Sequence, residues 1–414
     1  MGDSNWINQY KHKMQPNLIK ELRRPNTANM TSSKKLQVIV QFNKKLSSHH
    51  LKSLNKHVEP HHCAVIKKLQ LIDSISANVT HTGIKKLCKQ TYVSYVYLDH
   101  KVHTRLNIAA PAVGAAAAQK SGLTGKGVSI AIIDTGIYPH PDLTKPVNRI
   151  IAFKDFVGNR KTPYDDNGHG THVSGDASGN GFSSKGKYKG TAPKASLVGV
   201  KVLDRNGSGD ISKVIEGIQW VIHNRRRYNI RIINLSLGAA GVKKCSQDPL
   251  CQAVTKAWKS GIVVVAAAGN SGPSSGTIES PGINPFIITV GAVNDRRTIR
   301  QSDDIMAGFS SRGPVSGSHK PDIVAPGSNI VSLRAPNSQL SRGLRSQIVG
   351  GSYLRLSGTS MATPIVAGAI AQILQRFPGM RPGQLKAMLK RKAVNLGFKS
   401  TAQGSGEVNN RFLK

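Results

Sequence analysis

The pattern of apolar and polar residues changes character near residue 128. Beyond this point short runs of β-branched residues recur, and nearly every position within each run is apolar. Strands that are buried on both faces have this pattern. The runs cover residues 128–133, 196–203, 230–237, 261–268 and 286–293. They therefore predict a set of strands inside a covered sheet.

Helical stretches separate several of these runs. Residues 211–224 and 249–259 have the apolar spacing of helices, and an apolar helical run follows Pro364 to about residue 377. Strands that alternate with helices favour a doubly wound, mostly parallel α/β sheet with helices on both faces. In such sheets the active site lies at the carboxyl ends of the strands.

The chain before this region follows a different plan. Residues 36–42 and 93–98 alternate as strands do, and residues 47–57 and 82–89 favour helices. The long alternating segment 67–79 either breaks or pairs as two strands. The order β-α-β-β-α-β predicts a small ferredoxin-like α+β domain.

Three regions follow from these patterns. Residues 1–34 are polar and basic with little periodicity, which predicts a loosely ordered N-terminal extension. Residues 35–106 form the small α+β domain, and residues 107–414 form the α/β domain. The latter begins with an Ala-rich, helix-favouring stretch that extends to residue 126.

Composition adds a strongly basic charge to this picture. The chain has 58 Lys and Arg against 21 Asp and Glu, a formal net charge of +37. Such a charge attracts polyanions without sequence preference. The basic residues are spread along the chain, so we favour a solvated basic surface with non-specific polyanion contact over a dedicated nucleic-acid site.

The sequence gives little information about where the protein acts. The longest apolar stretch, 262–268, is too short to span a bilayer, which predicts no transmembrane segment. The N-terminus has no apolar core of a secretory signal. We therefore expect a cytoplasmic protein or one released by another route, with extracellular action included.

Cys245 and Cys251 lie close enough in sequence to pair in an oxidising setting, but free thiols are favoured.

Three short motifs carry candidate chemistry. Asp134 directly follows the run 128–133, His169 has a glycine on each side, and Ser360 begins the last apolar helix. Each has a plain structural alternative: an Asx turn for Asp134, a zinc ligand for His169 and an N-cap for Ser360.

The zinc alternative fails on spacing. A zinc-protease helix needs Glu after its first His and a second His four residues along. Here Gly170 replaces that Glu, and His172 follows after three residues. His172 is also a rival base, but a residue one turn into a helix more often packs beneath a site.

Together the three motifs describe a nucleophile, a base and an orienting acid. A serine nucleophile needs a base to take its proton, and the base needs a carboxylate to fix its tautomer. Asp134, His169 and Ser360 have the chain order Asp, His, Ser, which is the subtilisin order. They are therefore the predicted catalytic triad.

The motifs Asp-Thr-Gly at 134–136, Gly-His-Gly-Thr-His at 168–172 and Gly-Thr-Ser-Met-Ala-Thr-Pro at 358–364 resemble the signatures of the subtilases, peptidase family S8. The resemblance covers nearly all of residues 110–410. The stretches TGIYPHPDL and PYDDNGHGTHVSGD resemble the AprX-like branch of bacterial subtilases. The implied fold is the subtilisin-like α/β fold, preceded by a propeptide.

This resemblance implies further roles. Asn270 becomes the oxyanion-hole side chain, although a simple turn residue is the alternative. Two segments become the substrate-binding walls, and their small residues imply an apolar preference at P1, the residue before the cleaved bond. These segments are Ser236, Leu237, Gly238 and Ala267, Ala268, Gly269.

The resemblance also implies self-inhibition. The α+β domain then acts as an intramolecular inhibitor whose tail occupies the active site, with cleavage between Leu106 and Asn107. No cofactor is needed for the chemistry. Many subtilases bind structural calcium, and Asp142 is the candidate ligand, although the Lys-rich loop 179–190 discourages a cation.

The sequence therefore predicts a serine endopeptidase of broad specificity that acts on polypeptides. Because the histidine must be neutral to act as a base, activity is expected to rise through about pH 6.5 to 7.5. Two rivals are a catalytically inactive subtilase fold and a polyanion-binding protein.

Overall fold

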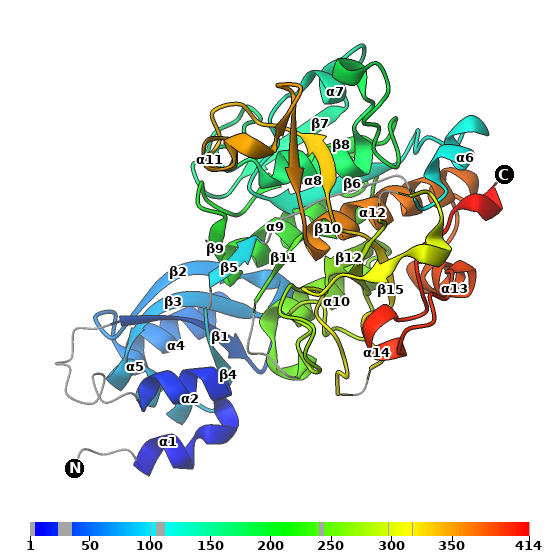
Figure 1. Ribbon diagram of the computed structural model, residues 1–414. Coiled ribbons are helices and arrows are strands. Elements are labelled where there is room, and N and C mark those ends of the chain that lie inside the picture. The colour runs from blue at the N-terminus through cyan, green and yellow to red at the C-terminus, as the bar shows by residue number, and fades with distance from the viewer. Residues whose placement is uncertain are drawn as a thin grey trace.

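The computed structural model describes residues 5–23, 35–99, 101–104, 112–239, 244–296, 298–316 and 318–413. A small α+β domain lies against one side of a larger α/β domain (Figure 1). None of the helices in these ranges is long and apolar enough to cross a membrane.

The large domain is built on one twisted sheet. Its strand order is β14-β13-β12-β10-β6-β8-β7, and β15 pairs with β13. Neighbouring strands are parallel except for β14, which runs antiparallel to β13. The strands are β6 (Ser129–Asp134), β7 (Ile150–Asp155), β8 (Ser196–Lys201), β10 (Ile230–Leu235), β12 (Val263–Ala267), β13 (Ile288–Asn294), β14 (Ile305–Met306) and β15 (Ile323–Pro326). This is the predicted doubly wound, mostly parallel sheet.

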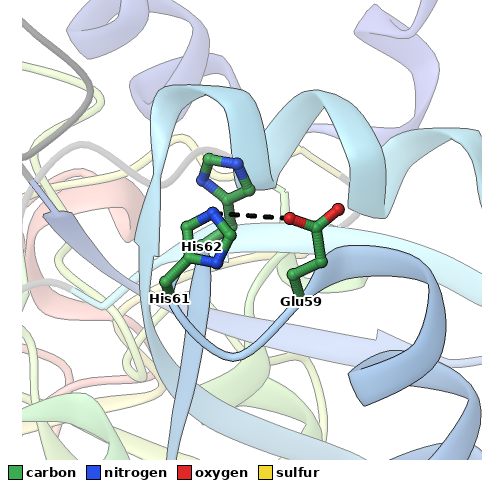
Figure 2. Close-up of side chains that lie close together, drawn as sticks. All are labelled: Glu59, His61 and His62. Carbon is green, nitrogen blue, oxygen red and sulfur yellow. Dashed lines mark ion pairs between the residues drawn. The ribbon is translucent and has the colours of Figure 1, made fainter.

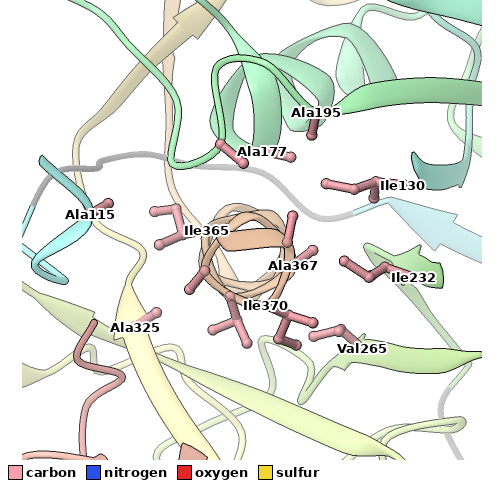
Figure 3. Packing of buried hydrophobic residues seen from close by; sticks show 14 of the residues in the cluster. Ala115, Ile130, Ala177, Ala195, Ile232, Val265, Ala325, Ile365, Ala367 and Ile370 are labelled. Carbon is pink, nitrogen blue, oxygen red and sulfur yellow. The ribbon is translucent and has the colours of Figure 1, made fainter. Parts of the chain in front are cut away.

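Helices cover both faces of the sheet because successive strand residues point to opposite sides. Ile130 and Ile132 of β6 pack with α8 (His169–Ser178) and α12 (Thr359–Arg376). Ala131 and Ile133 pack on the other face with α9 (Ile211–Asn224) and α10 (Pro249–Lys259). Figure 3 shows α12 along its axis, surrounded by apolar side chains from the sheet and from α8.

Smaller elements complete the large domain. A three-stranded antiparallel sheet, in the order β16-β18-β17, lies beside α8. These and the remaining elements are α6 (Ala115–Lys120), α7 (Pro141–Thr144), β16 (Ile330–Leu333), α11 (Gln339–Gly343), β17 (Ile348–Val349), β18 (Tyr353–Leu356), α13 (Pro382–Lys392) and α14 (Ser400–Gln403).

All five apolar runs predicted from the sequence are strands. The strand β7 was not predicted because it is an edge strand with half-exposed residues, so its apolar run is interrupted. The expected Ala-rich helix extends to residue 126, but within its described residues, 112–126, only α6 is helical.

The small domain has a four-stranded antiparallel sheet in the order β2-β3-β1-β4. Its elements are β1 (Lys35–Phe42), α4 (Ser48–Val58), β2 (Cys63–Leu69), β3 (Ser74–Thr80), α5 (His81–Lys89) and β4 (Val93–Leu98). The segment 67–79 does break, because a short 3₁₀ turn at Gln70–Ile72 separates β2 from β3. The order and connections are those of a ferredoxin-like fold.

The expectation of a loosely ordered extension is wrong for residues 5–23. They form α1 (Asn5–Gln9) and α2 (Pro16–Leu22), which pack against the small domain. Met14, Leu18 and Leu22 are buried at four-residue spacing, and Trp6 is buried beside them. These apolar residues are few and are surrounded by polar ones, so their helical periodicity was too weak to predict the two short helices.

The small domain docks on the helices α9 and α10 through the outer face of its sheet. Ile39, Leu69, Ile72 and Tyr97 join the apolar cluster that these helices form. Tyr97 also accepts a hydrogen bond of 2.9 Å from Gln252 of α10. The opposite face of the sheet packs on α4 and α5.

A further strand leads from this domain toward the sheet of the large one. The strand β5 (Lys101–Thr104) lies between β11 (Leu237–Gly238) and β9 (Ser208–Asp210) and is antiparallel to both. Figure 1 shows this strand at the junction of the two domains.

Candidate active site

Asp134 ends the buried strand β6 at its carboxyl edge, where the parallel sheet places it. One carboxylate oxygen, Oδ1, accepts hydrogen bonds from the backbone N–H of Thr135 at 2.7 Å and from His169 Nδ1 at 2.8 Å. Both side chains are buried, so this pair is shielded from water.

His169 is the first residue of α8, and its neighbouring glycine lets two backbone segments meet. A Cβ added to Gly170 would lie 2.2 Å from the carbonyl oxygen of Gly136. No larger residue fits this contact, which brings the start of α8 against the loop after β6. The glycines of both motifs therefore serve the approach of His169 to Asp134.

His172 packs beneath the site, as expected from its position one turn into the helix. Its Nδ1 lies 3.0 Å from Asp176 Oδ2, and its Nε2 lies 3.1 Å from the carbonyl oxygen of Leu354. Burial raises the pKa of Asp176, and His172 opposes that rise. With both ring nitrogens occupied, His172 is neither the base nor a zinc ligand here.

Ser360 lies in the first turn of α12, which packs against α8. Its hydroxyl donates to the carbonyl oxygen of Ser236 at 3.2 Å. Backbone N–H groups at a helix start lack partners within the helix and carry the positive end of the dipole. They provide a favourable place for developing negative charge.

Asn270 follows β12 and is held by the residue before Ser360. Its Oδ1 accepts hydrogen bonds from the backbone N–H of Thr359 at 2.9 Å and from the Thr359 hydroxyl at 3.0 Å. The acceptor atom of the amide is thereby fixed, so the orientation of its NH₂ group is fixed as well.

The predicted substrate edge does pair with an extended chain. Leu237 lies opposite Thr104, and Gly238 lies opposite His103, in the antiparallel pairing of β11 with β5. An extended peptide that adds a strand to a sheet edge binds mainly through its backbone. Leu106 and Asn107, the expected cleavage position, lie outside the described residues.

Three supporting residues were missed from the sequence. Asp165 accepts hydrogen bonds from the Thr135 hydroxyl at 2.9 Å and from both the N–H and hydroxyl of Thr171, at 2.8 and 2.7 Å. The buried Lys201 donates to the carbonyl oxygen of Thr135 at 2.6 Å. Asp165 holds the loop after Asp134 against α8, and Lys201 fixes the same loop from β8. The Asp-Asp-Asn run before the histidine motif was the only signal for Asp165, and no motif marks Lys201.

Glu279 is the third missed residue. Its carboxyl group lies against both predicted substrate-binding segments: a Cβ added to Gly238 would lie 2.6 Å from Oε2, and one added to Gly269 would lie 2.6 Å from Cδ. The residue is only 4% exposed. No sequence motif marks it, because it reaches the site from a loop between β12 and β13.

The surroundings of Asp142 do not fit a calcium ion. Its two carboxylate oxygens already accept hydrogen bonds from Ser183 N–H at 2.8 Å and from Tyr353 O–H at 2.7 Å. The Arg149 guanidinium donates to the backbone carbonyl of the same residue. Calcium prefers six to eight oxygen ligands, and here the oxygens of Asp142 accept hydrogen bonds from protein donors.

The described cysteines, including Cys245 and Cys251, are free thiols.

Comparison with known proteins agrees with this geometry. Residues 125–412 match the model of the Subtilase family. Serine protease AprX of Bacillus subtilis (strain 168) is 44% identical over 375 residues, which are 87% of this chain and 83% of that protein. Subtilisin E of the same organism is 37% identical over 352 residues, 83% of this chain and 81% of that protein.

A solved structure supports the fold. The crystal structure of fervidolysin from Fervidobacterium pennivorans, described as a keratinolytic enzyme related to subtilisin, aligns with a TM-score of 0.72 and 23% identity. The alignment covers 92% of this chain and 60% of the fervidolysin chain. The chain belongs to the subtilase family of serine endopeptidases, within the AprX-like branch.

Proposed function

We propose that this endopeptidase hydrolyses peptide bonds through an acyl-enzyme in which Ser360 is the nucleophile, His169 the base and Asp134 the orienting acid. The buried 2.8 Å hydrogen bond between Asp134 and His169 is the observation that carries the proposal. It holds the imidazole in the tautomer whose other nitrogen accepts the serine proton, and the carboxylate stabilises the cation that forms.

Asn270 and the backbone N–H of Ser360 stabilise the oxyanion. The carbonyl oxygen becomes negative in the tetrahedral intermediate, so donors placed there lower the barrier rather than only binding substrate. The fixed Oδ1 of Asn270 supports this role, because it orients the amide. No cofactor enters any of these steps.

The small domain, residues 35–106, is proposed as an inhibitor of the same chain. Its docking on α9 and α10 and the pairing of β5 with β11 support this role. A segment that already fills the substrate edge excludes polypeptide substrates until it is cut and released. Cleavage at Leu106–Asn107, expected from the sequence, stays a prediction.

The test is hydrolysis of casein by the purified chain and by Ser360→Ala. We expect hydrolysis by the native chain, its loss on treatment with a serine-directed covalent inhibitor, and none from the variant. Ser275→Ala, on an exposed loop, is the matched control and should remain active. Equal hydrolysis by Ser360→Ala would overturn the assignment.

Non-specific contact with polyanions accompanies the charge of +37 and is a secondary proposal. Salt-sensitive retention of Ser360→Ala on a polyanion column would support it, and passage without retention at low salt would remove it. Action outside the cell, one of the expectations from the sequence, is the place of action that we propose.

A further inference from the structure

The position of Glu279 bears on which substrates the site accepts. The segments 236–238 and 267–269 are the predicted walls of the substrate pocket, and the Glu279 carboxyl group lies where side chains of Gly238 and Gly269 would otherwise lie. Gly269 also has φ of +104°, which favours glycine. The two glycines thus open the pocket walls to a carboxyl group, whose Oε1 is held by the Ser271 hydroxyl at 2.8 Å.

The register of β5 shows which substrate residue reaches this pocket. His103 lies opposite Gly238, and Thr104 lies opposite Leu237. Antiparallel pairing advances one residue on each strand, so a peptide in this register has its next residue opposite Ser236. The carbonyl of Ser236 is 3.2 Å from the Ser360 hydroxyl, which makes that next residue P1.

In the chain's own sequence the residue after Thr104 is Arg105. Arg105 and Leu106 lie outside the described residues, so the count continues on the sequence alone. It predicts cleavage between Arg105 and Leu106, one residue before the bond expected from the resemblance. The carboxyl group in the pocket and this count along the sequence therefore lead to the same side-chain chemistry at P1.

We infer that Glu279 makes this protease selective for Arg or Lys at P1, and that the chain processes itself after Arg105. Arginine offers two parallel N–H donors to a carboxylate, and Gly238 and Gly269 leave the Glu279 carboxyl group between the two predicted pocket walls. The inference departs from the apolar P1 preference expected from the resemblance, and it rests on the proposed catalytic roles.

The test compares peptide anilides that differ only at P1, with Arg, Lys, Phe or Leu after Ala-Ala-Pro. We expect kcat/KM for Arg to exceed that for Phe by about 10-fold to 100-fold, the range that a buried charge-assisted pair supports. Glu279→Gln keeps the shape and the contact with Ser271 but removes the charge, so this ratio should fall to about 1 or below.

Glu216→Gln is the matched control, because it removes one carboxylate from α9 on the surface where Lys67 docks. Its ratio should equal that of the native enzyme. Mass spectrometry of the mature chain should give Leu106 as its first residue, and benzamidine, a small cationic P1 mimic, should inhibit the native enzyme competitively. These last two measurements stand even if Glu279→Gln does not fold.

The results separate this inference from the proposed function. Hydrolysis of casein and of the Phe peptide without preference for Arg, or a mature chain that begins at Asn107, would overturn the P1 assignment alone. Loss of all hydrolysis in the native enzyme would instead contradict the proposed catalytic roles.

A second, independent feature lies in the small domain. Glu59, His61 and His62 gather in the turn between α4 and β2 (Figure 2), and one donor atom from each lies within 4.8 Å of the others. His61 Nε2 and Glu59 Oε2 are 3.4 Å apart. Two ligands of a tetrahedral zinc ion, bound at 2.0–2.1 Å, lie about 3.3 Å apart.

Neighbouring residues orient two of these donors. Lys86 Nζ lies 2.5 Å from Glu59 Oε1, which leaves Oε2 toward the histidines. His62 Nδ1 lies 2.9 Å from the Thr80 hydroxyl, which leaves Nε2 for another ligand. Partners of this kind, which fix a ring and a carboxylate from behind, accompany metal-binding histidines and carboxylates.

The geometry points to a zinc site formed by Glu59, His61 and His62, with water in the fourth position. Its effect is to tie the end of α4 to the start of β2, which stabilises the small domain. The probe is zinc chloride alone, added to the full chain carrying Ser360→Ala, with calorimetry and thermal unfolding as readouts.

We expect one zinc ion per chain, a higher Tm that EDTA reverses, and loss of both effects in His61→Ala. His57→Ala is the matched control, since His57 is an exposed histidine of α4 outside the cluster, and it should bind zinc normally. Absence of binding by the native site, or equal binding by His61→Ala, would overturn the zinc assignment.

Discussion

The contact between Thr359 and Asn270 permits a sharp test of the proposed oxyanion hole. The Thr359 hydroxyl donates to Asn270 Oδ1 at 3.0 Å and accepts from the backbone N–H of Gly269 at 3.2 Å. Thr359→Val removes that hydroxyl and keeps the shape of the side chain. Asn270 then keeps only its hydrogen bond from the Thr359 backbone.

Two magnitudes follow from these contacts. One lost hydrogen bond is worth about 1 kcal/mol, which corresponds to about a 5-fold lower kcat if the amide loses that much alignment. The Gly269 N–H loses its buried acceptor, so the free energy of unfolding should fall by about 1–3 kcal/mol. KM should change little, because the strand pairing of the substrate is untouched.

The assay is steady-state kinetics on a peptide anilide, with Thr363→Val as the matched control. Thr363 is buried on the same helix, but its hydroxyl donates only to the carbonyl oxygen of Thr359, at 2.7 Å. Its kcat should therefore stay near the native value. Removing an oxyanion-hole donor lowers kcat by about 10²- to 10³-fold in subtilisin itself, which is the upper limit for Thr359→Val.

A double-mutant cycle with Asn270→Ala decides the mechanism. If Thr359 acts through Asn270, Thr359→Val should lower kcat no further once the amide is gone. An undiminished effect in that background, or an equal effect of Thr363→Val, would refute the reasoning.

Three other changes are predicted. Asp165→Asn should lower both Tm and kcat, because it leaves at least one buried donor of Thr171 or Gly168 unpaired; an unchanged melting curve and unchanged kcat would contradict this. Gln252→Ala removes the hydrogen bond to Tyr97 and should shorten the lag before activity in freshly folded chain; an unchanged lag would argue against docking as the restraint. Burial, assisted by Asp304, raises the pKa of Glu407 from 4.5 to about 10. The folded chain therefore holds a proton that the unfolded chain releases, so Tm should fall between pH 6 and pH 9, and less so in Glu407→Gln; parallel curves would contradict this.

Much of the large domain could be predicted because its strands are buried on both faces. Such strands need unbroken apolar runs, and each of the five runs proved to be a strand. The edge strand β7 is half exposed and shows no such run. The motif around His169 was informative for a similar local reason, since its glycines permit a backbone contact that no larger residue allows.

Other features depend on contacts between residues that are far apart in the chain. The placement of Trp6 and Leu18 under the small domain, of Asp165 beneath the loop of Asp134 and of Glu279 against Gly238 comes only with the folded chain. Glu279 stands in no recognisable motif, and the few apolar positions around Trp6 and Leu18 are too sparse to predict helices. The run that contains Asp165 does not show which groups its carboxylate binds. The order of the motifs was enough to predict a serine endopeptidase, but the side-chain chemistry that the pocket offers depends on a loop that folding brings to it.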